Sequence, residues 1–444
     1  MRFSTSELAA QLGGELVGPD VSVDGASIDS RTLEAGQLYV PIVADRDGHA
    51  FIAAALDAGA PAYLTMQAPV GGTAIRVADT SVALMNLGVP ARDRVGGVAG
   101  ITGSVGKTTT KDLLRACLGA VFLTAASERS FNNELGLPLT LLNAPDGAQW
   151  VVLEMGARGV GHIEQLARVA RPEVGIVTSV AMAHVEYFGD LDGVARAKSE
   201  LVAALPASGV AVLNLDDPRV AGMASDSPCP VLGYAMDGEA EVRAADVVLD
   251  GELHPRFRIS TPWGTGEVRL ALHGLQQVPN ALAAAAAALW CGVPFDDVVV
   301  ALAGVTGSPL RMEVHHAPGG PVLVVDCYNA NPASTEAALR SLAALGAGRK
   351  LALLGLMAEL GAETGAEHDR MARQAEELGI EVVGYQTDLY GAARVDDVGA
   401  AVALLRTLGP GDALLVKGSR VARLEDVARA YGSEAGVQSL AAGA

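Results

Sequence analysis

The chain has 444 residues, half of them hydrophobic, and a formal net charge of -19 at pH 7. This length exceeds the size at which a single hydrophobic core stops growing, so we expect two or three domains. The negative charge argues against binding of nucleic acid through its phosphates, which requires clustered Lys and Arg. The first residues lack the apolar core of a signal peptide, and the longest apolar stretch, Ala281 to Cys291, is too short to span a bilayer. We therefore expect a cytoplasmic protein that binds small ligands without membrane insertion.

Residues 1–82 mix short strands with a helix. Residues 21–31 and 37–42 alternate polar and apolar side chains as strands do, residues 51–60 are typical of a helix, and residues 61–65 and 73–79 are typical of strands. The segment from Asn86 to Arg94 is expected to be a connection. The pattern predicts a small N-terminal α/β domain.

Residues 83–312 alternate buried strands with helices. Nearly continuous apolar runs at 95–102, 151–155, 174–180 and 209–217 are separated by helical patterns near 107–121, 160–170, 192–205 and 280–290. Strands of this kind between helices predict a parallel sheet that is covered on both faces.

Residues 313–444 repeat the alternation with strands at 321–327, 351–357, 381–385 and 413–419. Helices are expected after Asn331-Pro332, because proline suits a first helical turn, and over 365–378. This block predicts a Rossmann-like α/β domain without a GxGxxG fingerprint. The four cysteines, Cys117, Cys229, Cys291 and Cys327, form no C-x-x-C pair and are expected to be reduced core thiols rather than a disulfide or zinc site.

A strand runs into the segment GSVGKTTT at residues 103–110 and then into a helical pattern. Gly103 and Gly106 permit a tight turn whose N–H groups face inward, and the helix start favours a phosphate. Lys107 can reach the β- and γ-phosphates, and the Thr108 hydroxyl can join the shell of a magnesium ion. Ile101 stands where the strict Walker A spacing has a glycine. The segment therefore indicates a variant nucleotide-binding loop; the alternative is an ordinary glycine-rich turn between strand and helix.

Polar residues at the carboxyl ends of the central strands are candidates for the ligand site, because open α/β sheets bind ligands there. Glu154 ends one strand and suits a magnesium ion that also touches the phosphates, although a helix cap or surface acid fits the pattern as well. His184 follows another strand, and Lys198 lies fourteen residues further on. Taken alone, such a His is usually structural and such a Lys usually solvated.

Several motifs together resemble the Mur ligase family. They are IDSR, GQLYV and DGHAFI in the first block, TGSVGKTTT, SFNNELGLPLTLL, HVEYFG and AKSEL in the second, and DCYNANP, LMAELG and VKGSR in the third. The resemblance covers nearly the whole chain. It implies three domains: an N-terminal domain for a uridine nucleotide substrate, a central ATP-binding domain, and a C-terminal domain that closes over the amine substrate.

The resemblance assigns a role to each candidate residue of the chain. Lys107, His184 and Lys198 are expected to be catalytic, with Lys198 carbamylated so that it offers anionic oxygens to a metal, and two magnesium ions are expected. ATP is assigned to Gly103, Ser104, Gly106, Lys107, Thr108, Thr109, Asn280, Arg311 and Asp326; magnesium to Thr108, Glu154, His184 and Lys198; and the other substrates to Ser30, Arg31, Asp47, His49, Asn132, Asn133, Tyr328, Asn329, Asn331, Lys417 and Ser419.

Three places depart from the family pattern. Arg129-Ser130 stand where Gly-Asn is usual, Gln276-Gln277 where His-Asn is frequent, and Leu356 where an acid is usual. The first departure affects contacts to the acyl substrate, and the third affects the loop nearest the incoming amine. No expected metal or phosphate ligand is lost.

The activity implied by the resemblance is the ATP-dependent joining of D-alanyl-D-alanine to UDP-N-acetylmuramoyl-tripeptide through an acyl phosphate, a step of peptidoglycan precursor synthesis. A monomer is expected. Two alternatives stay open at this point. One is another amide ligase of the superfamily, such as a folylpolyglutamate-type enzyme; the other is a non-catalytic nucleotide-binding scaffold. The first-block motifs and YNANP argue against the former, and retention of Lys107, Glu154 and His184 argues against the latter.

Overall fold

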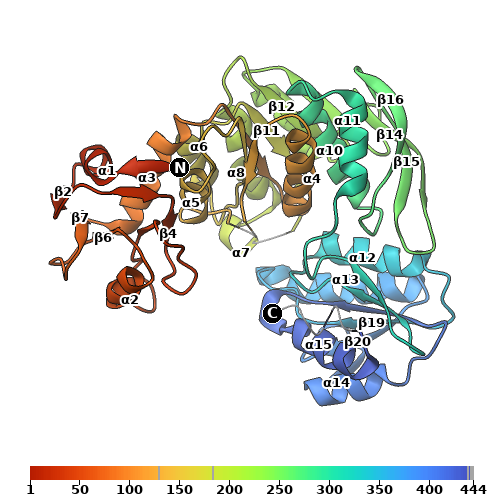
Figure 1. Cartoon of the computed structure of the whole chain (residues 1–444). Coiled ribbons are helices and arrows are strands. Elements are labelled where there is room, and N and C mark those ends of the chain that lie inside the picture. Colours follow the sequence, from red (N-terminus) through yellow and green to blue (C-terminus); the bar gives the residue numbers. More distant parts are fainter. Residues whose placement is uncertain (129–130, 183–184, 438–439, 441–444) are drawn as a thin grey trace.

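The computed structural model describes residues 1–128, 131–182, 185–437 and 440. The chain forms three parts in sequence order, and the middle part lies between the other two (Figure 1). Each part has a β-sheet with helices packed against it, so the predicted mixed α/β fold with parallel sheets is confirmed.

The N-terminal part has a five-stranded sheet and a separate antiparallel pair. The sheet order is β2-β7-β6-β5-β4, with β4 to β7 parallel and β2 antiparallel. The pair is β1 with β3. The elements are β1 (Arg2–Ser4), α1 (Thr5–Leu12), β2 (Glu15–Val17), β3 (Ser22–Asp24), β4 (Ala26–Ser27), β5 (Leu38–Tyr39), η1 (Gly48–Phe51), α2 (Ile52–Asp57), β6 (Ala62–Thr65) and β7 (Thr73–Arg76).

The segment expected to be a connection, Asn86 to Arg94, instead lies largely within helix α3 (Thr80–Arg92), which also spans the expected domain boundary at residue 82. The Asp79 side chain caps this helix by accepting hydrogen bonds from two N–H groups of its first turn. Buried Leu84, Leu87 and Ala91 give the helix an apolar face, which packs on two helices of the middle part. The expectation was wrong because these apolar residues recur at helical spacing, which outweighs the polar and proline residues between them.

The middle part is built on a nine-stranded sheet of order β16-β15-β14-β13-β12-β11-β8-β10-β9. The seven strands β8 to β14 are paired in parallel. Strand β15 is antiparallel to both of its neighbours, β14 and β16. The strands are β8 (Gly97–Thr102), β9 (Thr124–Ala126), β10 (Trp150–Glu154), β11 (Val174–Val177), β12 (Val210–Asn214), β13 (Val231–Ala235), β14 (Val242–Leu249), β15 (Pro255–Thr261) and β16 (Gly264–Arg269).

Helices cover both faces of this sheet. The alanine-rich helix α10 (Gln277–Trp290) is buried along almost its whole length and packs on α4 (Lys107–Gly119), because small side chains let two helices approach closely. The other helices are α5 (Gly136–Leu142), α6 (His162–Ala170), α7 (Val185–Phe188), α8 (Leu191–Ala203), α9 (Pro218–Gly222), η2 (Met223–Asp226) and α11 (Phe295–Gly304). The predicted helices near 107, 160, 192 and 280 are therefore present.

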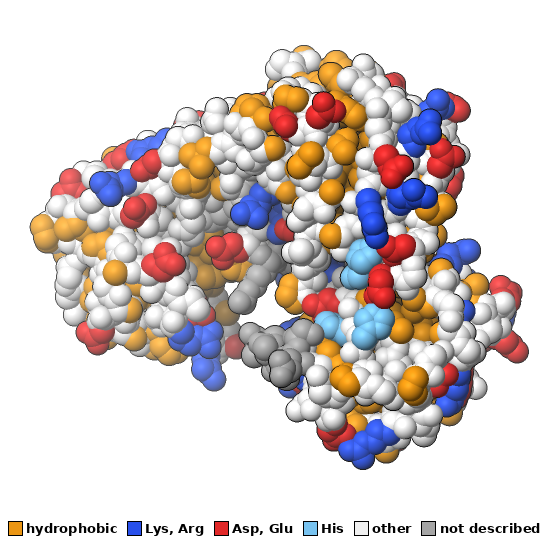
Figure 2. Space-filling view, turned by 45° about the vertical axis from the view of Figure 1, so that its right-hand side comes forward, with side chains coloured by type: hydrophobic (Ala, Val, Ile, Leu, Met, Phe, Trp, Pro, Cys, Tyr) orange, Lys and Arg blue, Asp and Glu red, His pale blue; other side chains and the backbone are white. Residues whose placement is uncertain are grey.

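The two antiparallel hairpins over residues 242–269 were not anticipated from the sequence. The turn between β14 and β15 reaches the C-terminal part, where Leu253 is fully buried in a cluster with Met312, Val324 and Leu339. Beside it, Glu252 Oε2 lies 2.7 Å from His316 Nε2 of the C-terminal part. Figure 2 shows histidine side chains beside acidic ones at this junction.

The C-terminal part has a six-stranded sheet of order β17-β18-β22-β19-β20-β21, parallel except for β17. Asn331 caps α12, and Pro332 occupies its first turn as the sequence predicts. The elements are β17 (Glu313–His316), β18 (Val322–Val325), α12 (Pro332–Ala344), β19 (Lys350–Leu354), η3 (Gly361–Glu363), α13 (Thr364–Glu377), β20 (Glu381–Tyr385), β21 (Ala393–Val395), α14 (Val398–Leu405), β22 (Ala413–Lys417), η4 (Arg420–Ala422) and α15 (Leu424–Ala435).

Among the residues that the structure describes, no helix combines the length and the apolar character needed to cross a membrane.

Candidate functional site

A cavity of about 400 Å³ lies between the middle and C-terminal parts. One wall carries the carboxyl ends of the middle strands, and the other carries the segments that follow β18, β19 and β22. Of the residues assigned from the sequence, the cavity is lined by Ser104, Gly106, Lys107, Thr108, Thr109, Asn132, Glu154, Asn280, Arg311, Asp326, Tyr328, Asn329, Asn331 and Lys417.

The loop between β8 and α4 has the backbone geometry of a phosphate site. Gly103 and Gly106 have φ values of +148° and +87°. A Cβ at Gly103 would lie 1.8 Å from Thr178 Oγ1, and one at Gly106 would lie 2.3 Å from Asn280 Oδ1, so neither position tolerates a side chain. The Ser104 hydroxyl donates to Ala181 O (3.0 Å) and fastens the loop to the segment that follows the neighbouring strand.

Lys107 is folded back onto this loop. Its Nζ donates to Gly103 O at 2.7 Å. Burial lowers the pKa of Lys107, the Glu154 carboxylate opposes this by raising it, and Arg311 lowers it further. A triphosphate in the loop would supply anionic oxygens to this buried cation.

Thr108 and Glu154 meet beneath the loop. The Thr108 hydroxyl donates to Glu154 Oε2 (2.8 Å), and the Asn132 amide donates to Glu154 Oε1 (2.9 Å). Glu154 is only 2% exposed, so these hydrogen bonds replace the water that its carboxylate oxygens would otherwise contact. The register of β10 beside β8 brings them together, because it pairs Glu154 with Ile101, next to the loop.

Asn280 and the residues before it stand on the opposite side of the loop. The Asn280 amide donates to Gln277 Oε1 (2.9 Å), and its Oδ1 accepts from Thr110 (3.4 Å). Gln276, which also lines the cavity, accepts a long hydrogen bond from Ser341 of α12 (3.4 Å). Of the two glutamines that depart from the family pattern, Gln277 therefore makes a contact inside the middle part, and Gln276 makes one between the two walls.

Arg311 reaches the loop from the junction of the two parts. Its Nη2 donates to Thr108 Oγ1 (3.2 Å), and its guanidinium lies 4.1 Å from the centre of the Tyr328 ring. Leu310 and Met312 on either side have φ values of +63° and +52°, which are uncommon for residues other than glycine. The Met312 N–H donates to Asp326 Oδ1 (3.3 Å) and helps to hold this bend.

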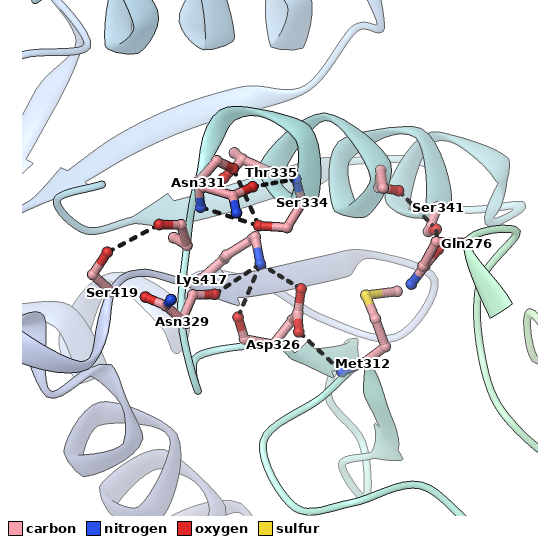
Figure 3. A network of polar contacts seen from close by, with 12 residues as sticks. Gln276, Met312, Asp326, Asn329, Asn331, Ser334, Thr335, Ser341, Lys417 and Ser419 are labelled. Atoms are coloured by element: carbon pink, nitrogen blue, oxygen red, sulfur yellow. Dashed lines mark hydrogen bonds and ion pairs between the residues drawn. The ribbon is translucent and has the colours of Figure 1, made fainter. Parts of the chain in front are cut away.

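The C-terminal wall is a hydrogen-bonded network (Figure 3). Lys417 Nζ contacts Asp326 Oδ2 at 2.6 Å and donates to Asn329 O at 3.2 Å. Asn331 Oδ1 accepts from the Ser334 N–H at the start of α12. The Ser419 hydroxyl donates to Ala330 O (3.1 Å) and accepts from the Ala358 N–H (2.9 Å). Ser419 does not line the cavity, and it joins two loops of the wall rather than facing a ligand.

Lys198 lies on α8, buried to 6% exposure. Burial lowers its pKa to about 7, and the charge of Lys107 contributes to the lowering. His184, its expected partner, and Arg129-Ser130 lie outside the described residues. Within the described ranges there is no group of three His, Cys, Asp or Glu side chains arranged to hold a metal.

The four substrate residues assigned to the N-terminal part do not line this cavity. Ser30 and Arg31 follow β4, and exposed Arg31 pairs with Asp29 (2.6 Å). His49 is buried; its Nδ1 lies 2.6 Å from Asp47 Oδ1, and its Nε2 accepts from a backbone N–H (3.1 Å). Both ring nitrogens of His49 are therefore used within the protein.

Asn133 also lies away from the cavity lining. Its Oδ1 accepts from the Gly136 N–H at the start of α5 (2.9 Å). Its neighbour Asn132, by contrast, reaches Glu154. Of the two adjacent asparagines, one therefore faces the site and the other caps a helix.

Several lining residues were missed by sequence reasoning. Thr178 and Ser179 directly follow β11 and hold the phosphate loop, through a hydrogen bond from Thr178 Oγ1 to Val105 O (2.6 Å) and one from the Val105 N–H to Ser179 Oγ (3.1 Å). They could have been found, since they lie at the carboxyl end of a central strand, where Glu154 also lies. Others are Asn214, Tyr234 and Ser334.

Comparison with known proteins agrees with this architecture. Residues 101–288 match the Mur ligase middle domain, and residues 310–420 match the Mur ligase, glutamate ligase domain. The UDP-N-acetylmuramoyl-tripeptide--D-alanyl-D-alanine ligase of Mycobacterium tuberculosis is 37% identical, with 97% of this chain and 98% of that protein covered.

Two solved structures are also similar. MurF from Acinetobacter baumannii has a TM-score of 0.89 at 28% identity, covering 98% of this chain and 99% of that one. The MurF ligase from Thermotoga maritima in complex with ADP has a TM-score of 0.83 at 26% identity, covering 94% of this chain and 99% of that one. The chain therefore belongs to the Mur ligase family.

Proposed function

We propose that the chain is an ATP-dependent amide ligase that joins D-alanyl-D-alanine to UDP-N-acetylmuramoyl-tripeptide and releases ADP and phosphate. The main support is the cavity itself, which places the phosphate loop and Glu154 opposite the Asp326–Lys417 wall. The names of the full-length relatives supply the two substrates. We propose that residues 1–82, 83–312 and 313–444 act as the domains that bind the uridine nucleotide, ATP and the dipeptide.

The reaction must activate a carboxylate, which is a poor acyl donor at neutral pH. A carboxylate oxygen of the tripeptide attacks the γ-phosphorus of ATP, ADP leaves, and an acyl phosphate forms. Lys107 and Arg311 both line the cavity, and their charges would reduce repulsion between the two anions and stabilise the phosphoryl oxygens. The dipeptide amine then attacks the acyl carbon, an amide forms, a proton is lost and phosphate leaves.

The residues beneath the loop fit a magnesium ion. Thr108 and Glu154 present a hydroxyl and a carboxylate oxygen 2.8 Å apart, and hard oxygen donors are those that magnesium prefers. When bound, the ion would neutralise charge on the β- and γ-phosphates. We infer that Thr108 and Glu154 would hold it, with the phosphates and water completing its shell.

We also propose that Lys198 is carbamylated and, with His184, serves a second magnesium ion. A primary amine reacts with carbon dioxide in its neutral form, and the lowered pKa of Lys198, about 7, makes that form abundant at neutral pH. The carbamate would replace a buried ammonium by an anionic oxygen donor.

A coupling assay tests the proposal. Purified enzyme with ATP, magnesium, UDP-N-acetylmuramoyl-tripeptide and D-alanyl-D-alanine should give a product heavier than the tripeptide by one dipeptide less one water, with one ADP per product. Tripeptides with meso-diaminopimelate and with lysine are run side by side. Extension only of a folate by glutamate would favour the other amide ligase, and nucleotide binding without any product would favour a non-catalytic scaffold.

A further inference from the structure

The hairpin of β14 and β15 reaches from the middle sheet toward the C-terminal part (Figure 1). Strand β14 pairs with β13 over its first two residues, whereas its pairing with β15 continues to Leu249. The register of the hairpin shifts between Ala245 and Val248, and Asp246 has a φ of +56° there. This bulge separates the base of the hairpin, which belongs to the middle sheet, from its outer half. The position of the turn over 250–254 therefore depends on what the turn itself contacts.

One side of this turn is held by the C-terminal part. The Leu253 side chain is fully buried in an apolar cluster with residues of β18 and α12. Beside it, Glu252 Oε2 lies 2.7 Å from His316 Nε2 of β17. The turn is carried by a strand of the middle part, but its side chains are therefore anchored in the C-terminal part.

The backbone of the same turn is held by the middle part. His273 Nδ1 donates to Glu252 O (2.7 Å), and the Gly274 N–H donates to Leu253 O (2.8 Å). His273 and Gly274 shortly precede α10, which begins at Gln277. The turn thus connects the C-terminal core to the segment that leads into α10.

Hydrogen bonds continue from this segment to the phosphate loop. Gln277 Nε2 donates to His273 O (3.3 Å), and Gln277 Oε1 accepts from the Asn280 amide (2.9 Å). Asn280 Oδ1 accepts from Thr110 (3.4 Å) and lies 2.3 Å from the position of a Cβ on Gly106. Both amide side chains line the cavity, although they are only 4% and 7% exposed. Consecutive contacts therefore join the hairpin turn to the loop that we expect to bind phosphate.

We propose that Leu253 is a positioning residue for nucleotide binding. By fixing the turn in the C-terminal core, it holds residues 273–280 against the phosphate loop. This inference rests on the proposed function, which places ATP in that loop. The affinity for a nucleotide then depends on whether Leu253 stays in its cluster, and because such coupling is reciprocal, a bound nucleotide holds the turn more firmly.

The first test is binding of ADP with magnesium to the full-length protein, measured by calorimetry. Leu253→Ala should weaken ADP binding roughly five- to tenfold. Leu253→Met, which fills most of the same space, should stay within about twofold of the native affinity. Leu345→Ala is the matched control, because Leu345 is a buried leucine of the same cluster at the end of α12. This control should lose stability as Leu253→Ala does, but it should bind ADP as the native protein does.

Hydrogen exchange gives a readout that a general loss of stability does not change. The Gly274 N–H should exchange several times faster in Leu253→Ala, relative to the N–H groups of the parallel strands in the middle sheet. In Leu345→Ala this ratio should equal the native one. ADP should slow exchange of the Gly274 N–H in the native protein, and it should do so less in Leu253→Ala.

Two results would overturn the role of Leu253. One is an ADP affinity that is unchanged in Leu253→Ala or equally reduced in Leu345→Ala. The other is an unchanged exchange ratio at Gly274 in Leu253→Ala. If the alanine variant does not fold, the smaller truncation Leu253→Val is compared with Leu345→Val by the same measurements. Absence of ADP binding by the native protein would instead overturn the proposed function.

Discussion

The buried lysines of the two cavity walls differ in the groups that their ammonium groups contact. On the middle wall, burial lowers the pKa of Lys107, and Lys107 Nζ donates to a backbone carbonyl rather than to a carboxylate. Burial also lowers the pKa of Lys198, which lies on α8 outside the cavity lining. On the C-terminal wall, Lys417 is deeply buried but contacts Asp326 at 2.6 Å. The buried lysine of the middle wall would therefore be stabilised by an anionic ligand. The buried lysine of the C-terminal wall already has a carboxylate of the protein as its counter-ion. We infer that the first does chemistry and the second positions loops.

The largest expected effect is on turnover, and it follows from removing the buried cation of the middle wall. Lys107→Ala removes the cation that we propose acts on the transferred phosphoryl group, which should raise the activation barrier by about 4 kcal/mol and so lower kcat roughly a thousandfold. ADP release measures it. The variant should keep the native melting temperature, because the Lys107 ammonium makes its hydrogen bond to a loop carbonyl and not to a counter-ion. Near-native ADP release would remove the loop from the mechanism.

Lys198→Ala should raise the activation barrier by about 3 kcal/mol, since the proposed metal ligand is removed. Added acetate is expected to restore part of the rate by supplying carboxylate oxygens. A ¹³C-carbamate signal should be present in the native enzyme under ¹³CO₂ and absent from the variant. A fully active alanine variant contradicts the carbamate.

On the C-terminal wall the expected loss is in stability. Asp326→Asn leaves the Lys417 ammonium, 1% exposed, without a counter-ion, which should lower the free energy of unfolding by about 3 kcal/mol. Denaturant titration measures this. The double variant Asp326→Asn/Lys417→Met should recover much of it, whereas no loss in the single variant would show that the pair is not a structural one.

Lowering the pH should weaken the same wall. Burial lowers the pKa of His368, whose Nε2 accepts from the Met357 N–H in the neutral form, although its bond to Thr364 O acts in the other direction. The unfolded chain therefore binds the proton more readily, and stability falls as pH drops below the ordinary histidine pKa of about 6.5. Melting temperatures from pH 8 to pH 5 should fall more for the native protein than for His368→Gln. An equal fall in melting temperature for the two proteins would show that His368 does not cause the loss of stability.

The smallest effect is expected at Leu356. Leu356→Asp restores the acid that is usual in the family, and because Leu356 does not line the cavity we expect the KM for the dipeptide to fall by no more than about tenfold. Steady-state kinetics at saturating ATP and tripeptide decide this. A rise in KM would indicate that the apolar side chain serves the loop itself.

The difference between the walls also explains what the sequence could predict. The glycine-rich loop could be predicted because its residues are consecutive in the sequence, and the position of Glu154 in the cavity could be predicted because parallel strands end at one edge of the sheet. The sequence could not predict that Asn133, Asn331 and Ser419 form hydrogen bonds with backbone groups of the protein. An asparagine or serine is the same letter in the sequence whether its side chain caps a helix, joins two loops or contacts a ligand. The hairpins over 242–269 were missed because polar side chains alternate along them, without the continuous apolar runs of the buried strands.

Leu253 has a mechanical consequence for the molecule. Its side chain, carried by a hairpin of the middle part, is fully buried in the C-terminal core. Withdrawing a leucine from such a core costs about 2 kcal/mol, so arrangements that pull it out are roughly thirtyfold rarer than those that keep it in place. Together with the covalent crossing before β17 and the Glu252–His316 contact, this leucine attaches the turn of the β14–β15 hairpin to the C-terminal part. A displacement of the C-terminal sheet must therefore either carry this turn with it or expose the leucine to water.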